Sequence, residues 1–145
     1  MELGKIPPND IEAEQAILGS MLVDKDAVIS AIETLKPDDF YREDNKAIYG
    51  AMLNLYNRVE PIDIITLKSE LVSLGTFEKV GGLEYIASLP DMSPTSSNIE
   101  KYIRIVEEKS MLRNLIGTAN EIIALGYERN RRSRSNNGRI REEDI

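Results

Sequence analysis

The chain has 145 residues, of which 41% are hydrophobic and 30% charged, a composition typical of a folded globular domain. It contains neither Cys nor His, which excludes disulfides, thiolate and imidazole catalysis, and the usual zinc and haem ligands. No apolar run is long enough for a membrane span, and the first ten residues lack signal-peptide features. We therefore expect a cytoplasmic protein with one compact unit and an appendage.

The charge is divided unevenly along the chain, whose net charge is −7. Residues 1–128 carry 12 Lys and Arg against 22 Asp and Glu, whereas residues 129–145 carry six Arg against three acids. The acidic body argues against a nucleic-acid surface spread over the whole domain. The Arg-rich tail needs an explanation of its own.

Helical periodicity dominates the first half of the chain. Asn9, with Glu12 three residues later, has the pattern of a capping box and predicts a helix start. Apolar residues at helical spacing predict four helices, at about 11–22, 26–35, 43–57 and 64–74. We expect Phe40, Leu71 and Leu74 to face the core, and Gly75 to end the fourth helix in the left-handed conformation. No pair of strands is predicted.

The second half predicts a short helix and a long one. Gly81-Gly82 marks a turn, and the short helix after it should end at Pro90. Ser97 and Glu100 form a second capping-box pattern, which opens a helix over about 98–125 with Gly126 as its C-cap. That helix would be roughly 40 Å long, and its apolar stripe is too wide for one packing face. Part of it should project and require partners.

Catalytic patterns are absent from the sequence. No phosphate-binding loop of the G-x-x-x-x-G-K-[ST] type exists, and Gly81-Gly82 lacks the following Lys. The neighbouring acids Asp38-Asp39 and Glu107-Glu108 are typical of a solvated surface, and the serines at 93–97 have no base to activate them. We predict no catalytic, cofactor or metal site, so a small enzyme is the disfavoured hypothesis.

Several ordered segments resemble the N-terminal domain of the bacterial replicative DNA helicases of the DnaB type. The resemblance runs from residue 6 to about residue 127, with a local departure at Asn45-Lys46, where the family often has His-Arg. The segments that carry it are Ile6-Pro7-Pro8-Asn9-Asp10-Ile11-Glu12-Ala13-Glu14-Gln15-Ala16-Ile17-Leu18-Gly19, Pro37-Asp38-Asp39-Phe40-Tyr41, Pro61-Ile62-Asp63-Ile64-Ile65-Thr66-Leu67, Gly81-Gly82-Leu83-Glu84-Tyr85-Ile86, Tyr102-Ile103-Arg104-Ile105-Val106-Glu107-Glu108-Lys109 and Arg113-Asn114-Leu115-Ile116.

The resemblance implies an all-α fold in which a helical head, residues 1–96, is followed by the first arm of a helical hairpin, residues 97–127. It implies a non-catalytic domain that oligomerises, as dimers within a hexameric ring, and that docks the helicase-binding domain of primase. ATP and Mg²⁺ would belong to a separate motor domain, DNA would be reached only through the ring, and no membrane is involved. The alternative from another class is a free-standing helical adaptor or regulator.

The apolar residues of the long helix spread over more than one packing stripe, so two faces are needed. We assign one face to the hairpin and its dimer mate, and the other to primase, as the resemblance implies. A plain intra-hairpin core remains the alternative for all of them. The oligomer residues are Val106, Leu112, Leu115, Ala119 and Ile123, and the partner-binding residues are Ile116 and Ile122, with Tyr85 from the head.

The tail, residues 128–145, does not match the family and has three interpretations. Its arginines could bind phosphates, although no aromatic residue is interleaved to stack on bases. It could be a disordered linker or a vector-derived remnant. Alternatively, the reading frame has slipped by one base, because the shifted frame of A-rich codons from Arg129 onwards can encode an acidic amphipathic helix. Sequencing the encoding DNA distinguishes these.

Overall fold

The computed structural model describes residues 5–93 and 99–144, with side chains as far as residue 135. All regular structure in these ranges is helical, which confirms the predicted all-α fold. The elements are α1 (Ile11–Val23), α2 (Lys25–Thr34), the 3-10 helix η1 (Pro37–Asp39), α3 (Glu43–Asn57), α4 (Ile64–Leu74), α5 (Gly82–Ser88), the 3-10 helix η2 (Leu89–Met92) and α6 (Ile99–Asp144). No helix in the described ranges is long and apolar enough to cross a membrane.

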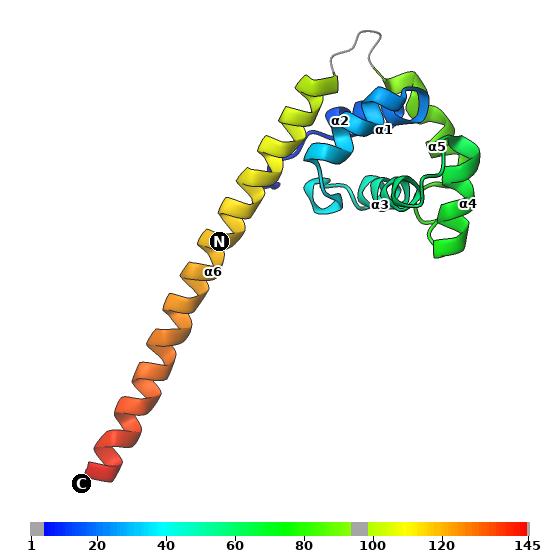
Figure 1. Ribbon diagram of the computed structural model, residues 1–145. Coiled ribbons are helices and arrows are strands. Elements are labelled where there is room, and N and C mark those ends of the chain that lie inside the picture. Colours follow the sequence, from blue (N-terminus) through cyan, green and yellow to red (C-terminus); the bar gives the residue numbers. More distant parts are fainter. Residues whose placement is uncertain (1–4, 94–98, 145) are drawn as a thin grey trace. The chain divides into compact units, whose positions relative to one another are not determined.

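The chain divides into two compact units, and the division falls inside α6 (Figure 1). One unit, here called the head, is residues 8–111; the other consists of residues 1–7 and 112–145. We call residues 112–144 of α6 the distal helix. The sequence placed the end of the head at residue 96, whereas the structure includes the first three turns of α6. Ile103 and Val106 explain the difference, because both are buried in the core of the head.

The head is built around α1, which contacts α2, α3 and η2. At Gly19 the chain of η2 comes so close that a Cβ atom there would lie 2.0 Å from the carbonyl oxygen of Leu89. Phe40 and Leu71 are both buried, as predicted. Phe40 stacks on Tyr49, with ring centroids 4.7 Å apart. Tyr49 is itself fully buried, and its hydroxyl lies within hydrogen-bond distance of the Ala31 and Leu35 carbonyl oxygens at the end of α2.

The helix ends follow side-chain capping, with some differences from prediction. Asp10, not Asn9, caps α1, because its carboxylate accepts from the amide of Ala13. Asp63 caps α4 together with Thr66, and Gly75 is left-handed as predicted. Leu74 is 49% exposed, so its prediction as a core residue is wrong; it lies three residues beyond Leu71 in the last turn. Pro90 lies inside η2 rather than after the helix, and Ser97 lies outside the described residues.

The long helix does not end at Gly126. It continues to Asp144, so the predicted C-cap is wrong and residues 128–144 of the tail are helical. A glycine inside a helix costs only about 1 kcal/mol, and half of the residues from 127 to 144 are Glu or Arg, which are good helix formers. Arg132 also forms an ion pair with Glu128 at 3.1 Å, at the i,i+4 spacing that supports helices. No returning hairpin helix exists in the described part of the chain.

Candidate partner-binding surfaces

The distal helix carries a stripe of exposed apolar side chains. Five of them are between 38% and 66% exposed, and Ala119 is exposed as well. The group, here called the distal stripe, consists of Leu112, Leu115, Ile116, Ala119, Ile122 and Ile123. An apolar stripe of this length on a soluble helix indicates a surface that another helix or chain covers.

The spacing of the distal stripe differs from that of the residues that α6 buries in the head. Ile103, Val106 and Ser110 are buried, and three to four residues separate each from the next. The same spacing continues at Arg113, Asn114 and Gly117, which are polar or lack a side chain. The apolar residues after Met111 therefore belong to another face of the helix. The distal stripe is not a prolongation of the head core, so it requires a cover of its own.

The structure corrects two assignments on this helix. Val106 is 1% exposed and belongs to the core of the head, so it offers no surface for a second subunit. Ile116 and Ile122 were predicted to share one face, but six residues along a helix separate them by about 120°. Ile116 is on the same side of the helix as Ile123, about two turns away, and Ile122 is on the same side as Leu115. The two isoleucines thus occupy opposite margins of the distal stripe.

In the head, the predicted partner residue Tyr85 is held by a buried polar network. Its hydroxyl donates to Oδ1 of Asn45 at 2.5 Å and accepts from Nε2 of Gln15 at 3.1 Å. Asn45 is fully buried, and burial raises the pKa of the Tyr85 hydroxyl. The ring is half-buried, and the Arg42 guanidinium lies 5.2 Å from its centroid. The hydroxyl of Tyr85 therefore points into the head, and its ring lies at the surface.

Glu14 of α1 is the centre of this network. It is 1% exposed and accepts from the amide of Tyr41 at 2.6 Å, the amide of Arg42 at 3.4 Å and the Asn45 side chain at 2.9 Å. A buried carboxylate is stable when it has donors of this kind. Glu14 thereby fixes the backbone that enters α3, including Arg42. The sequence predicted none of this network. Apolar residues lie close to Glu14 and Asn45 in their helices, but that pattern alone does not reveal a buried polar contact.

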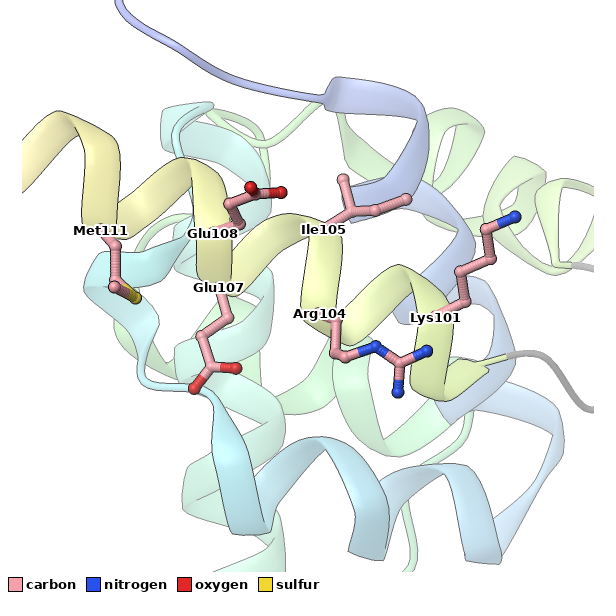
Figure 2. Close-up of a pocket in the computed structure, with 6 residues that line it drawn as sticks. All are labelled: Lys101, Arg104, Ile105, Glu107, Glu108 and Met111. Atoms are coloured by element: carbon pink, nitrogen blue, oxygen red, sulfur yellow. The ribbon is translucent and has the colours of Figure 1, made fainter.

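A shallow groove lies on the first turns of α6, within the head (Figure 2). Figure 2 shows two rows of side chains, with Lys101, Ile105 and Glu108 on one side of the helix and Arg104, Glu107 and Met111 on the other. The four charged residues form no ion pair with any described residue. The sequence predicted Glu107 and Glu108 as solvated surface, and both are exposed.

The described residues contain no group of three or more acidic, His or Cys side chains arranged to hold a metal ion. Each unit has an exposed surface suited to contact. On the distal helix it is the apolar distal stripe, and on the head it is the Tyr85 ring with the Arg42 guanidinium over it. Such features bind other macromolecules through a few anchoring side chains.

A family model described as the DnaB-like helicase N-terminal domain matches residues 6–108. The chain belongs to this family. The replicative DNA helicase DnaB of Geobacillus stearothermophilus is 48% identical over 125 residues, which is 86% of this chain and 28% of that protein. The replicative DNA helicase DnaC of Bacillus subtilis strain 168 is 49% identical over an equal length, with the same coverage of both proteins. The chain thus spans just over a quarter of these relatives, and the matched part includes no ATPase motor domain.

Solved structures agree with the family. The crystal structure of the N-terminal domain of DnaB helicase from Mycobacterium tuberculosis matches with a TM-score of 0.82 and 41% identity, over 85% of this chain and 88% of that one. The N-terminal domain of DnaB helicase from Helicobacter pylori, described with its interactions with primase, matches with a TM-score of 0.66 over 80% of this chain and 90% of that one. Its identity is 24%, so that match shows the fold alone. The resemblance seen in the sequence is confirmed.

Proposed function

We propose that this domain mediates self-association and primase docking in a replicative hexameric DNA helicase. The observation that supports the proposal is the distal stripe, whose large apolar side chains are exposed and follow a register of their own. Burial of apolar surface is the main driving force of protein association. A helix of this kind contributes little to a fold by itself and much to an interface.

The division of labour on the distal stripe follows the helix geometry. Leu112 and Ala119 lie at its centre, with Ile116 and Ile123 on one margin and Leu115 and Ile122 on the other. Two margins allow the helix to contact a second copy and primase at once. ATP, Mg²⁺ and DNA are tasks of the motor domain and ring of the complete helicase, which fits a match confined to just over a quarter of the relatives.

Self-association is tested by the solution mass of the 145-residue chain over a concentration series. The parent should form dimers or larger species, and Leu115→Asp should shift the chain to monomer because it places a charge in the buried contact. Asn114→Asp is the matched control, since it adds the same charge one residue away on the other side of the helix. A parent that stays monomeric at high concentration, or equal effects of the two substitutions, contradicts the proposal.

Primase docking is tested by titrating the helicase-binding domain of primase into the chain. Ile116 and Ile122 lie on opposite margins, so the variant, Ile116→Ala or Ile122→Ala, on the margin that contacts primase should weaken binding by roughly 1–2 kcal/mol. Circular dichroism should show unchanged helicity for both variants. Asn114→Ala serves as the control on the opposite side of the helix. If both isoleucine variants bind as tightly as the parent, the assignment of these residues to primase fails.

The alternative function, a free-standing adaptor, is distinguished from this proposal by the gene sequence. A downstream open reading frame encoding a motor with a phosphate-binding loop is expected for a helicase subunit. Its absence from the genome would favour the adaptor. ATP turnover by the purified chain would contradict both.

A further inference from the structure

The Tyr85 ring is covered on its outer side by the side chain of Arg42. The hydroxyl of Tyr85 is directed inwards to Asn45 and Gln15, so it is not available to a partner. The guanidinium of Arg42 lies over the ring, 5.2 Å from its centroid. A partner that approaches Tyr85 from this side meets Arg42 first.

Arg42 is held in place from two directions. Its backbone amide donates to the buried carboxylate of Glu14 at 3.4 Å, and stacking on Tyr85 restricts the guanidinium. An arginine that is positioned in advance loses less conformational entropy on binding than a mobile one. The side chain is nevertheless 43% exposed. Arg42 is thus both ordered and accessible.

The donors of Arg42 are only partly used. One terminal nitrogen contacts Asp44 at 3.0 Å, and Asp44 is the only carboxylate in ion-pair contact with Arg42 in the described part of the chain. The guanidinium carries five N–H donors in a planar fork. An edge of this fork with two parallel donors fits a carboxylate in a bidentate arrangement. The chemistry left exposed at this site therefore selects an anionic oxygen pair.

We infer that Arg42, stacked on Tyr85, is the residue by which the head recognises a carboxylate side chain of primase. The inference rests on the proposed docking function and identifies the chemistry of one of its contacts. Glu14 and Asn45 are positioning residues in this scheme, because they hold Arg42 and Tyr85 without touching the partner. Tyr85 supplies the surface on which the guanidinium is oriented.

The test compares Arg42→Met with Lys46→Met by titration calorimetry of the 145-residue chain with the primase domain. Lys46 is a matched control because it lies in the first turn of α3, is 32% exposed and is likewise ion-paired with acids, Asp38 and Glu43. Arg42→Met should weaken binding roughly tenfold, the usual worth of a charge-assisted contact. Its affinity should also depend less on salt than that of the parent. Lys46→Met should stay within about twofold of the parent.

Arg42→Lys keeps the charge and is used if Arg42→Met lowers the unfolding midpoint. It should bind several-fold more weakly than the parent, because an ammonium lacks the planar fork. Parent-like affinity of the folded Arg42 variants overturns the inference. Equal weakening by Arg42→Met and Lys46→Met also overturns it, since that result reports general charge. Tighter binding by Arg42→Met would mean that the Arg42 side chain shields Tyr85 and must move away before primase binds. That result would also overturn the inference.

Failure of this inference is distinguishable from failure of the proposed function. If Ile116→Ala weakens primase binding and Arg42→Met does not, docking occurs through the distal helix and Arg42 has no part in it. If the parent does not bind the primase domain at all, the docking function and the inference fall together.

Discussion

The head and the distal helix both carry large apolar side chains but differ in what stabilises them. In the head, Phe40, Tyr49 and Leu71 are buried against several elements at once, so each side chain is fixed by tertiary contacts. In the distal helix the large apolar side chains are exposed, and the helix depends on backbone hydrogen bonds and propensity. Substitutions in the head should therefore change folding stability, whereas those in the distal helix should change association.

The largest expected difference comes from truncating large apolar side chains in the two units. Phe40→Ala and Leu71→Ala should each lower the free energy of unfolding by roughly 2–5 kcal/mol, because both leave a cavity in a closed core. Leu115→Ala removes a similar side chain from the distal helix and should change monomer stability by less than about 0.5 kcal/mol. Chemical denaturation of dilute samples measures all three. Losses below about 1 kcal/mol at both head positions would refute the core assignment.

Replacing glycines in the two units tests the same comparison, with smaller expected changes in stability. Gly19→Ala places a methyl group against the backbone of η2, whose Leu89 oxygen would be 2.0 Å away, and should destabilise the head by about 1–3 kcal/mol. A Cβ atom added at Gly117 in the distal helix would meet nothing within 4 Å. Gly117→Ala should raise helicity, since alanine is favoured by up to about 1 kcal/mol in a helix. Thermal unfolding followed by circular dichroism compares the two. A stabilising Gly19→Ala would mean that α1 and η2 are packed less closely.

The fold could be predicted from the sequence wherever periodicity and capping act locally. The spans of α3 and α4, the left-handed Gly75, and the burial of Phe40 and Leu71 all follow from patterns within about ten residues. Local patterns were wrong at Leu74, which is 49% exposed, and at Gly126, which α6 passes through. They also cannot give burial that distant contacts decide. The sequence assigned Tyr49 no role, yet Phe40 and the end of α2 surround it, and Val106 is buried because the core of the head extends over α6. Local sequence contains neither fact.

The candidate site was predictable in part for the same reason. The apolar width of the distal stripe is visible in the sequence, and so is its need for a partner. The grouping of Ile116 with Ile122 on one face was wrong because a spacing of six is not a helical repeat. The network of Glu14, Asn45 and Tyr85 joins three helices, so no pattern within a short stretch of sequence predicts it.

The smallest expected effect concerns a helix end in the head that departs from the usual residue choice. After α3, the amide of Glu60 bonds to the Leu55 oxygen and the amide of Val59 to the Tyr56 oxygen. After α4, Thr76 and Gly75 make the equivalent bonds to Leu71 and Val72. Both ends are Schellman motifs, in which the residue before the last adopts a positive φ. Gly75 has a φ of 75° and Val59 a φ of 59°, so a β-branched residue occupies a glycine position.

Val59→Gly should therefore stabilise the head. A left-handed conformation costs a residue with a Cβ atom about 1–2 kcal/mol, while the added freedom of glycine in the unfolded chain costs about 0.5–1 kcal/mol. Val59 is 92% exposed, so little packing is lost, and the net gain in unfolding free energy should be about 0.5–1 kcal/mol. The exchange in the opposite direction, Gly75→Val, should lose at least as much at the matching position of α4. Denaturant titration of the two variants checks both signs, and a destabilised Val59→Gly would show that the valine side chain contributes a contact that outweighs its backbone strain.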